Sequence, residues 1–207
     1  MIGRTIVPAV ALALALALGW SGCFFDTRTP EAPTGDDTSG TRWRNASTPE
    51  RLVENVRVTT EDRQIDFYAR ALREDFAFRA DRLDSEDFAL QSRQPFADWD
   101  ETVERDNMQR IFDRADRIHL QFTEIDPVIS EISPDTARIG KHYELSIVEV
   151  DSVAPGEFSV DSSFYKGTLF LFIRDQGPEW AMYRWEDARP AELDLSSWGK
   201  LRGDTRP

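Results

Sequence analysis

Cysteine is almost absent from this 207-residue sequence, which contains only Cys23. A single cysteine excludes an internal disulfide bond and a metal site built on a Cys-x-x-Cys pair. Histidine is nearly as rare, and His119 and His142 lack the His-x-His or His-Glu-x-x-His spacing of common metal sites. A metal site would need both on adjacent strands together with Glu144. We expect surface or sheet-face histidines and no metal ion.

Several other signatures are missing. The sequence has no Gly-x-Gly-x-x-Gly or Gly-x-x-x-x-Gly-Lys-Ser/Thr motif, no Gly-x-Ser-x-Gly elbow and no Asp-x-Asp-x-Asp-Gly calcium loop. It also lacks a run of basic residues interleaved with aromatics, and its formal charge is −13. An acidic surface repels phosphate backbones. We therefore predict no cofactor and no nucleic-acid partner.

Apolar residues are present in two settings. They make up 40% of the chain, which is enough for a globular core. A separate apolar run, residues 6–18, follows Arg4 and ends in small residues before Cys23. This run is shorter than the roughly 20 residues of a membrane-spanning helix, and its layout is typical of an export signal.

The residues just before Cys23 resemble the lipobox of bacterial lipoprotein signal peptides. Ser21 and Gly22 supply the small side chains, whereas Trp20 departs from the usual aliphatic residue. The resemblance implies removal of a signal peptide, residues 1–22, and acylation of Cys23, with palmitate among the acyl chains. Residues 23–46, rich in Thr, Pro, Gly and Asp, are predicted to form a flexible acidic tether.

Anchoring through Cys23 predicts a lipoprotein of the bacterial cell envelope. Phe24 follows the cysteine where an Asp retains some lipoproteins at the inner membrane, so the periplasmic face of the outer membrane is preferred. The alternative is an ordinary cleaved signal that releases a soluble protein with an unused thiol.

Residues 47–189 carry the pattern of an α+β domain. Thr48 and Pro49 mark a helix start, and a second start at Thr60 indicates helices over 48–74. A short strand is predicted at 75–80, a loop at 81–97 and a helix at 98–115. Alternating apolar residues then predict four antiparallel strands, at 117–125, 137–150, 163–175 and 178–188.

This order resembles the nuclear transport factor 2-like superfamily, also called SnoaL-like or ketosteroid-isomerase-like. The similarity rests on "FYARALREDFAF", which includes Asp75-Phe76, on the helix that contains Trp99, and on "YKGTLFLFIRDQGPEWAMYRWEDA" with Trp180 or Trp185. It covers residues 48–189 and implies a cone-shaped fold with N-terminal helices packed on a curved, mainly antiparallel sheet.

The resemblance also implies a pocket inside the cone for a small apolar ligand. The candidate pocket residues are Tyr68, Phe76, Trp99, Phe122 and Tyr143. The ketosteroid-isomerase-like branch uses an Asp base with a Tyr and a neutral acid. Tyr68 and Asp75 match part of this set, but no second acid falls on an inward strand position. We expect a non-catalytic ligand- or partner-binding domain, with a small-molecule isomerase or cyclase as the alternative.

The two faces of the predicted sheet are both partly apolar. Leu169, Leu171 and Ile173 alternate with Phe170 and Phe172, and Trp180 and Met182 alternate with Tyr183 and Trp185. A solvated face of an antiparallel sheet should be polar, so a cover is predicted. The C-terminal tail, residues 190–207, could supply it through Leu193, Leu195 and Trp198, and so could a second copy in a homodimer through the sheet. A structural envelope subunit acting through this face is a third functional alternative.

Overall fold

The computed structural model describes residues 42–126, 128–154, 157–190 and 195–206. The chain divides into two units, Met1–Asp36 and Asp37–Pro207, and every described residue lies in the second. Cys23 and Leu193 fall outside the described residues. The signal peptide, the lipidation and most of the tether therefore stay predictions. Trp43 and Ala46 are buried in the core, so the folded unit begins before residue 47.

The helices begin where capping residues occur. Thr48 accepts the N–H of Arg51 and starts α2, Pro49–Glu61, while Asp100 accepts the N–H of Val103 and starts α5, Glu101–Arg114. Between them lies α3, Ile65–Arg70. The last helix is α6, Trp198–Thr205. Side-chain capping satisfies N–H groups that have no partner within the helix.

Helix α4, Arg82–Leu90, occupies a stretch that was predicted to be a loop. Asp81 caps it by accepting the N–H of Leu83. The helix buries only Asp84 and Phe88, which are four residues apart. The loop prediction was therefore wrong. It failed because two buried positions, one of them an acid, do not produce a helical period of apolar residues in the sequence.

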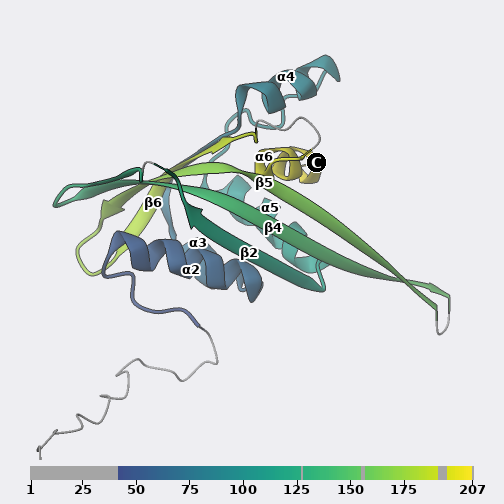
Figure 1. Cartoon of the computed structure of the whole chain (residues 1–207), viewed down its shortest axis with the longest axis horizontal. Helices are drawn as coiled ribbons and strands as arrows, with labels where there is room; N and C mark the ends of the chain where they lie inside the picture. Colours follow the sequence, from purple (N-terminus) through teal and green to yellow (C-terminus); the bar gives the residue numbers. More distant parts are fainter. Residues whose placement is uncertain (1–41, 127, 155–156, 191–194, 207) are drawn as a thin grey trace, which may run out of the picture. The chain divides into compact units, whose positions relative to one another are not determined.

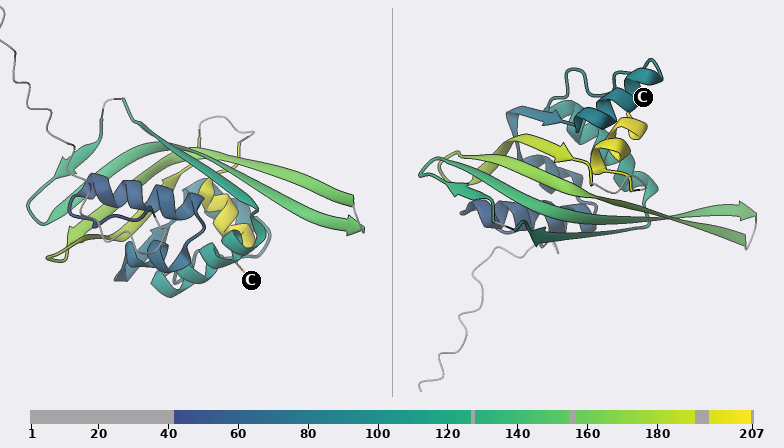
Figure 2. Two further views of the ribbon diagram at one scale, coloured as in Figure 1. Left: turned by 90° about the horizontal axis from the view of Figure 1, so that it is seen from below. Right: turned by 45° about the horizontal axis from the view of Figure 1, so that its top comes forward.

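Six strands form one sheet in the described part of the chain. They are β1 (Leu72–Arg79), β2 (Arg117–Glu124), β3 (Ser130–Ile132), β4 (Thr136–Ala154), β5 (Glu157–Asp175) and β6 (Trp180–Ala188). The order is β1-β6-β5-β4-β2, with β3 also beside β4. Strand β1 runs parallel to β6 and the other pairs are antiparallel. Helices α2, α3 and α5 cover one face of the curved sheet (Figures 1 and 2). The α+β prediction is confirmed.

The helix-covered face carries the core. Leu169, Leu171 and Ile173 of β5 are fully buried there. The pairing of β5 with β6 contains a bulge. Phe172 lies opposite Arg184, but the next residue, Ile173, lies opposite Met182, so one residue of β6 is left without a partner in β5. This bulge places Met182 and Trp185 on the same buried face. Simple alternation predicted them on opposite faces, and that prediction was wrong.

Aromatic residues on the other face of the sheet are covered by arginines of the sheet itself. The Arg184 guanidinium carbon lies 3.6 Å from the Phe172 ring centroid. The corresponding distance is 4.8 Å from Arg138 to Phe170 and 4.9 Å from Arg174 to Tyr183. Such contacts combine apolar packing with cation–π attraction.

The C-terminal tail was predicted to cover the face of the sheet that carries Phe170 and Phe172, and this prediction is wrong. Trp198 packs against Tyr143 and Trp185, which belong to the helix-covered face. Leu195, the second predicted anchor, is only partly buried. The tail reaches the core because arginines already shield Phe170 and Phe172, which leaves the opposite face as the larger apolar surface.

The two longest strands continue well past the rest of the sheet. Strand β4 reaches Ala154 and β5 begins at Glu157, whereas the predicted ends were Val150 and Ser163. The partner strands stop earlier: β2 pairs no further than Val148. We call residues 149–154 and 157–164 the β4–β5 ribbon, which extends away from the sheet in Figure 1.

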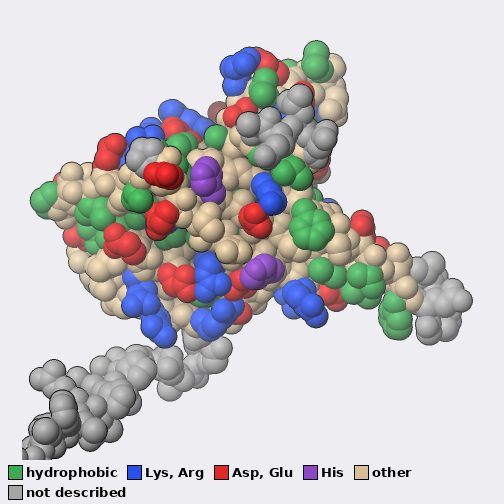
Figure 3. All heavy atoms as spheres, in the orientation of Figure 1, with side chains coloured by type: hydrophobic (Ala, Val, Ile, Leu, Met, Phe, Trp, Pro, Cys, Tyr) green, Lys and Arg blue, Asp and Glu red, His purple; other side chains and the backbone are tan. Residues whose placement is uncertain are grey.

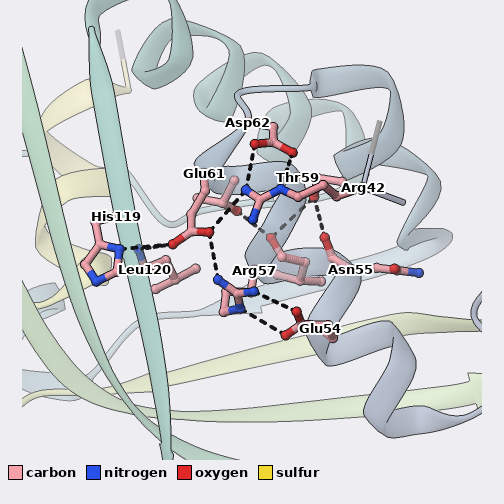
Figure 4. Close-up of polar contacts among 11 residues, drawn as sticks. Arg42, Glu54, Asn55, Arg57, Thr59, Glu61, Asp62, His119 and Leu120 are labelled. Carbon is pink, nitrogen blue, oxygen red and sulfur yellow. Dashed lines mark hydrogen bonds and ion pairs between the residues drawn. The ribbon is translucent and has the colours of Figure 1, made fainter. Parts of the chain in front are cut away.

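An ion-pair cluster fastens the start of the described chain to the domain (Figure 4). Glu61, at the end of α2, contacts Arg42 at 3.2 Å, Arg57 at 2.7 Å and the His119 ring of β2 at 3.1 Å. Asp62 adds a second contact to Arg42 at 2.6 Å. The cluster joins α2, β2 and Arg42, which lies in the last part of the predicted tether.

Candidate functional site

A buried ion pair occupies the space between the sheet and the helices. Glu104 of α5 and Arg202 of α6 both have fully buried side chains. The Arg202 guanidinium contacts the carboxylate through Nη2 at 2.7 Å and Nε at 3.1 Å. The Tyr68 hydroxyl donates to the same carboxylate at 2.6 Å and Trp99 Nε1 donates at 2.8 Å. Both carboxylate oxygens are therefore fully used by donors of the chain itself.

Aromatic rings enclose the Arg202 guanidinium. Its carbon lies 4.5 Å from the ring centroid of Phe78, 4.3 Å from that of Trp185 and 4.8 Å from that of Trp198. Burial lowers the pKa of Arg202, but Glu104, Tyr68 and Asp187 together raise it, so the net pKa is raised. The arginine thus stays charged inside the domain, with one counter-charge and three rings around it.

The first turn of α6 is held by hydrogen bonds to its backbone N–H groups. Trp198 N donates to the Tyr143 hydroxyl at 2.7 Å, and Gly199 N donates to Asp187 Oδ2 at 2.5 Å. Lys200 N donates to the Ser197 hydroxyl at 2.8 Å. These groups have no partner within a helix, and a carboxylate near them also interacts favourably with the helix dipole. Two of the acceptor groups, Tyr143 of β4 and Asp187 of β6, belong to the sheet, which therefore helps to dock α6.

Asp187 is the second buried acid of this site. Burial raises its pKa to about 7, although Arg202, the Gly199 N–H and Tyr143 act in the opposite direction. Its Oδ1 atom has no hydrogen-bond partner among the described residues. Burial, and then the charge of Asp187, also raises the pKa of Tyr143. The charge of the carboxylate is thus incompletely compensated, which is why its pKa is raised.

Asp84 of α4 completes the attachment of α6. Its fully buried carboxylate accepts the Ser197 hydroxyl and pairs with Arg189 Nε at 3.1 Å. Burial raises the pKa of Asp84, whereas Ser197 and Arg189 lower it in part. Helix α4, which the sequence pattern did not reveal, therefore provides one of the anchoring groups of the C-terminal helix.

The predicted pocket residues lie in three separate settings. Tyr68, Trp99 and Tyr143 do converge around the Glu104–Arg202 pair and α6. Phe76 is buried in the core on β1. Phe122 instead lines a groove of about 240 Å³ between α2 and the strands β2 and β4. The cone that was expected to hold a ligand is occupied by side chains of α6.

The structure does not bring Tyr68 and Asp75 together. Tyr68 is fully buried, and burial followed by the charge of Glu104 raises its pKa. The Asp75 side chain is 54% exposed and pairs with Arg73 at 2.6 Å and with Arg174 at 4.0 Å. The Arg73 hydrogen bond lowers the pKa of Asp75. A tyrosine inside the core and an acid on the surface cannot act on one substrate atom.

The central residues of the site, Glu104, Asp187 and Arg202, were missed by sequence reasoning. A signal existed for two of them. Glu104 lies four residues before Met108 on the apolar face of α5, and Arg202 lies four residues after Trp198. A charged residue within an apolar helical stripe indicates a buried partner, because an unpaired buried charge is costly.

The histidines occupy separate places on the sheet. His119 contacts Glu61, and His142 Nδ1 lies 2.9 Å from the Thr168 hydroxyl. Within the described ranges, no three His, Cys, Asp or Glu side chains are grouped to hold a metal ion. The described helices also include none of the length and apolarity needed to cross a membrane.

Comparisons with known proteins give matches in structure alone. Neither the protein-family models nor the curated protein sequences contain a match to this chain. A scytalone dehydratase-like protein from Novosphingobium aromaticivorans aligns with a TM-score of 0.53 and 9% identity, over 72% of this chain and 88% of that one.

Two further solved structures are similar to the same extent. A protein from Kribbella flavida aligns with a TM-score of 0.52 and 11% identity, over 74% of this chain and 93% of that one. A nuclear transport factor 2-like superfamily protein from Salmonella enterica aligns with a TM-score of 0.50 and 9% identity, over 70% and 90%. The described domain therefore has the nuclear transport factor 2-like fold, with its own C-terminal helix packed inside the cone.

Proposed function

We propose that this chain is a membrane-anchored protein of the bacterial cell envelope whose domain binds a partner through its surface and is not a catalyst. The observation that supports a non-catalytic role is the filled cone. Trp198 and Arg202 are fully buried where a ligand would enter. Their removal would expose Glu104 without a counter-charge, which is strongly unfavourable.

The alternative of a small-molecule isomerase or cyclase has less support. It needs an acid and a tyrosine that face a shared cavity. The Tyr68 hydroxyl is instead bonded to Glu104, and Asp75 is on the surface. The other buried acid–tyrosine pair, Asp187 and Tyr143, holds the N–H groups of Gly199 and Trp198. The Tyr68–Glu104 pair binds Arg202 of α6, and the Asp187–Tyr143 pair binds the first N–H groups of α6, so both pairs hold this helix in place.

Hydrogen exchange of the α6 amides tests whether the cone stays closed. A structural helix should exchange as slowly as the central strands, because it opens only with the whole domain. We expect protection of Leu201 and Arg202 close to that of Leu171. Exchange of α6 that is orders of magnitude faster than that of Leu171 would show a cone that opens, and would favour the ligand-binding or enzymatic alternative.

Anchoring is tested by changing the position of the thiol. Cys23→Ser should abolish incorporation of labelled palmitate and move the protein from the membrane fraction to the soluble fraction. The matched control combines Cys23→Ser with Phe24→Cys, which restores a thiol one residue later and should not restore labelling. Unchanged membrane association of Cys23→Ser would contradict the proposed anchor.

A further inference from the structure

The β4–β5 ribbon has an unusual amount of free edge. Beyond Val148 on β4, and before Tyr165 on β5, the two strands have strand partners only in each other among the described residues. An isolated two-stranded ribbon is marginally stable in water, and free strand edges invite association. A ribbon of this length is therefore expected to pack against another molecular surface.

The two faces of the ribbon differ sharply. Phe158, Val160 and Phe164 share one face of β5, and Val150 lies directly opposite Val160. These four side chains, which we call the apolar stripe, are 68%, 65%, 63% and 39% exposed in that order. Figure 3 shows apolar side chains along the ribbon on the face it displays.

Polar and acidic residues occupy the reverse face of the ribbon. Glu149 lies opposite Asp161, and Asp151 lies opposite Ser159. Every ionisable side chain described on the ribbon is acidic. An anionic lipid surface would repel these charges. The apolar stripe itself is uncharged, so it fits an uncharged apolar protein surface.

We propose that the apolar stripe packs face to face on the same stripe of a second copy of this chain. A two-fold axis through the middle of the stripe places Phe158 of one copy over Phe164 of the other, with Val160 near the centre. Each residue then meets its reciprocal contact, as an isologous interface requires. The acidic faces point away from each other into solvent, at least about 10 Å apart.

The size of the stripe suits a weak dimer. Two phenylalanines of roughly 150–250 Å² each, about two-thirds exposed, offer on the order of 250 Å² together. The two valines bring the stripe to about 400 Å², which is the size of patch that marks interaction sites. Two copies bury about 800 Å² of apolar surface, and polar flanks bring the total close to the roughly 1,000 Å² of a biological interface.

Sedimentation of the exported chain carrying Cys23→Ser tests the dimer without the anchor. We expect a concentration-dependent monomer–dimer equilibrium that tightens between about 50 and 500 mM salt, since salt screens the repulsion of two acidic copies. A chain that stays monomeric at all concentrations, or that dissociates as salt is added, would overturn the proposal.

Two variants with opposite charges test whether the surface that packs on the apolar stripe is the same stripe of a second copy. Phe158→Lys and Phe164→Glu should each weaken self-association at least tenfold with unchanged circular dichroism and Tm. Mixing the two variants should restore dimers, because the lysine of one copy then faces the glutamate of the other. The control, Leu90→Ser, removes an 87% exposed leucine on α4 and should dimerise normally.

Three results would each contradict the interface. The two single variants could associate as well as the unaltered chain, which would place the contact elsewhere. Their mixture could stay monomeric, which would exclude the two-fold packing. The Cys23→Ser chain could instead sediment with vesicles of neutral phospholipid in a manner that depends on Phe158, which would make a bilayer the occupant.

Discussion

Replacing Arg202 with methionine isolates the value of the buried charge pair. The methionine keeps much of the apolar stem, but Glu104 loses its counter-charge while both side chains are fully buried. Removing one partner of such a pair costs about 3–5 kcal/mol. In a domain of this size, about 1 kcal/mol shifts Tm by roughly 2–4 °C. We therefore expect Tm to fall by roughly 6–20 °C.

A double-mutant cycle separates the interaction energy of Glu104 with Arg202 from the contributions of the surrounding residues. Glu104→Gln leaves a charged Arg202 among the rings of Phe78, Trp185 and Trp198, and is expected to cost a similar amount. The double variant Glu104→Gln/Arg202→Met has no buried charge at this point. Its loss of stability should therefore be smaller than the sum of the single losses by about 1–3 kcal/mol.

The assay is urea unfolding of the Cys23→Ser chain at pH 7, followed by circular dichroism. Lys200→Met is the control on the same helix, because its partner Asp204 is half-exposed and the pair should contribute less than about 1 kcal/mol. Single losses below about 1 kcal/mol would refute the reasoning, and so would a double variant whose loss equals the sum.

Three other substitutions test the packing of α6. Asp187→Asn should flatten the pH dependence of unfolding. Burial raises the Asp187 pKa from 3.8 to about 7, so the protonated carboxyl stabilises the fold below pH 4, and this stability, roughly 4 kcal/mol, is lost progressively as pH rises from 4 through 7. Urea titrations at pH 4 and 8 measure this loss. Trp198→Ala should cost about 3–5 kcal/mol in the same assay. Gly167→Ala should lower Tm, because its Cβ would lie 2.5 Å from the Tyr143 hydroxyl and 2.6 Å from the Ala188 carbonyl.

Each of these expectations has a contrary outcome. An asparagine variant with the same pH slope as the unaltered chain would mean that Asp187 is not the titrating group. A small loss for Trp198→Ala would mean that α6 contributes little to the core. An unchanged Tm for Gly167→Ala would show that β6 and Tyr143 can move aside.

The fold could be predicted where local signals agree with the tertiary structure. Thr48 caps a helix in the chain as its sequence context indicates, and the alternation in β5 gives its buried face. The ribbon beyond Val150 was missed because its Ser and Asp residues weaken the strand signal. Met182 and Trp185 were predicted on opposite faces because a bulge changes the parity of a strand without changing its composition.

The candidate site was harder to predict because its partners are distant in sequence. Arg202 and Glu104 are separated by 98 residues, and no local pattern states which acid an arginine will meet. Tyr68, Trp99 and Tyr143 were predicted to line a ligand pocket, and all three are buried. Tyr68 and Trp99 bond Glu104, whereas Tyr143 accepts the N–H of Trp198, from a tail that was predicted to cover the other face.

The position of α6 also makes the domain sensitive to whether its chain has been completed. Leu201 and Arg202 of α6 complete a core that begins, along the described chain, at Trp43. A chain truncated before them would hold an uncompensated acid and an unfilled interior, and it would remain accessible to proteases. The domain can therefore complete its core only after α6 has been synthesised.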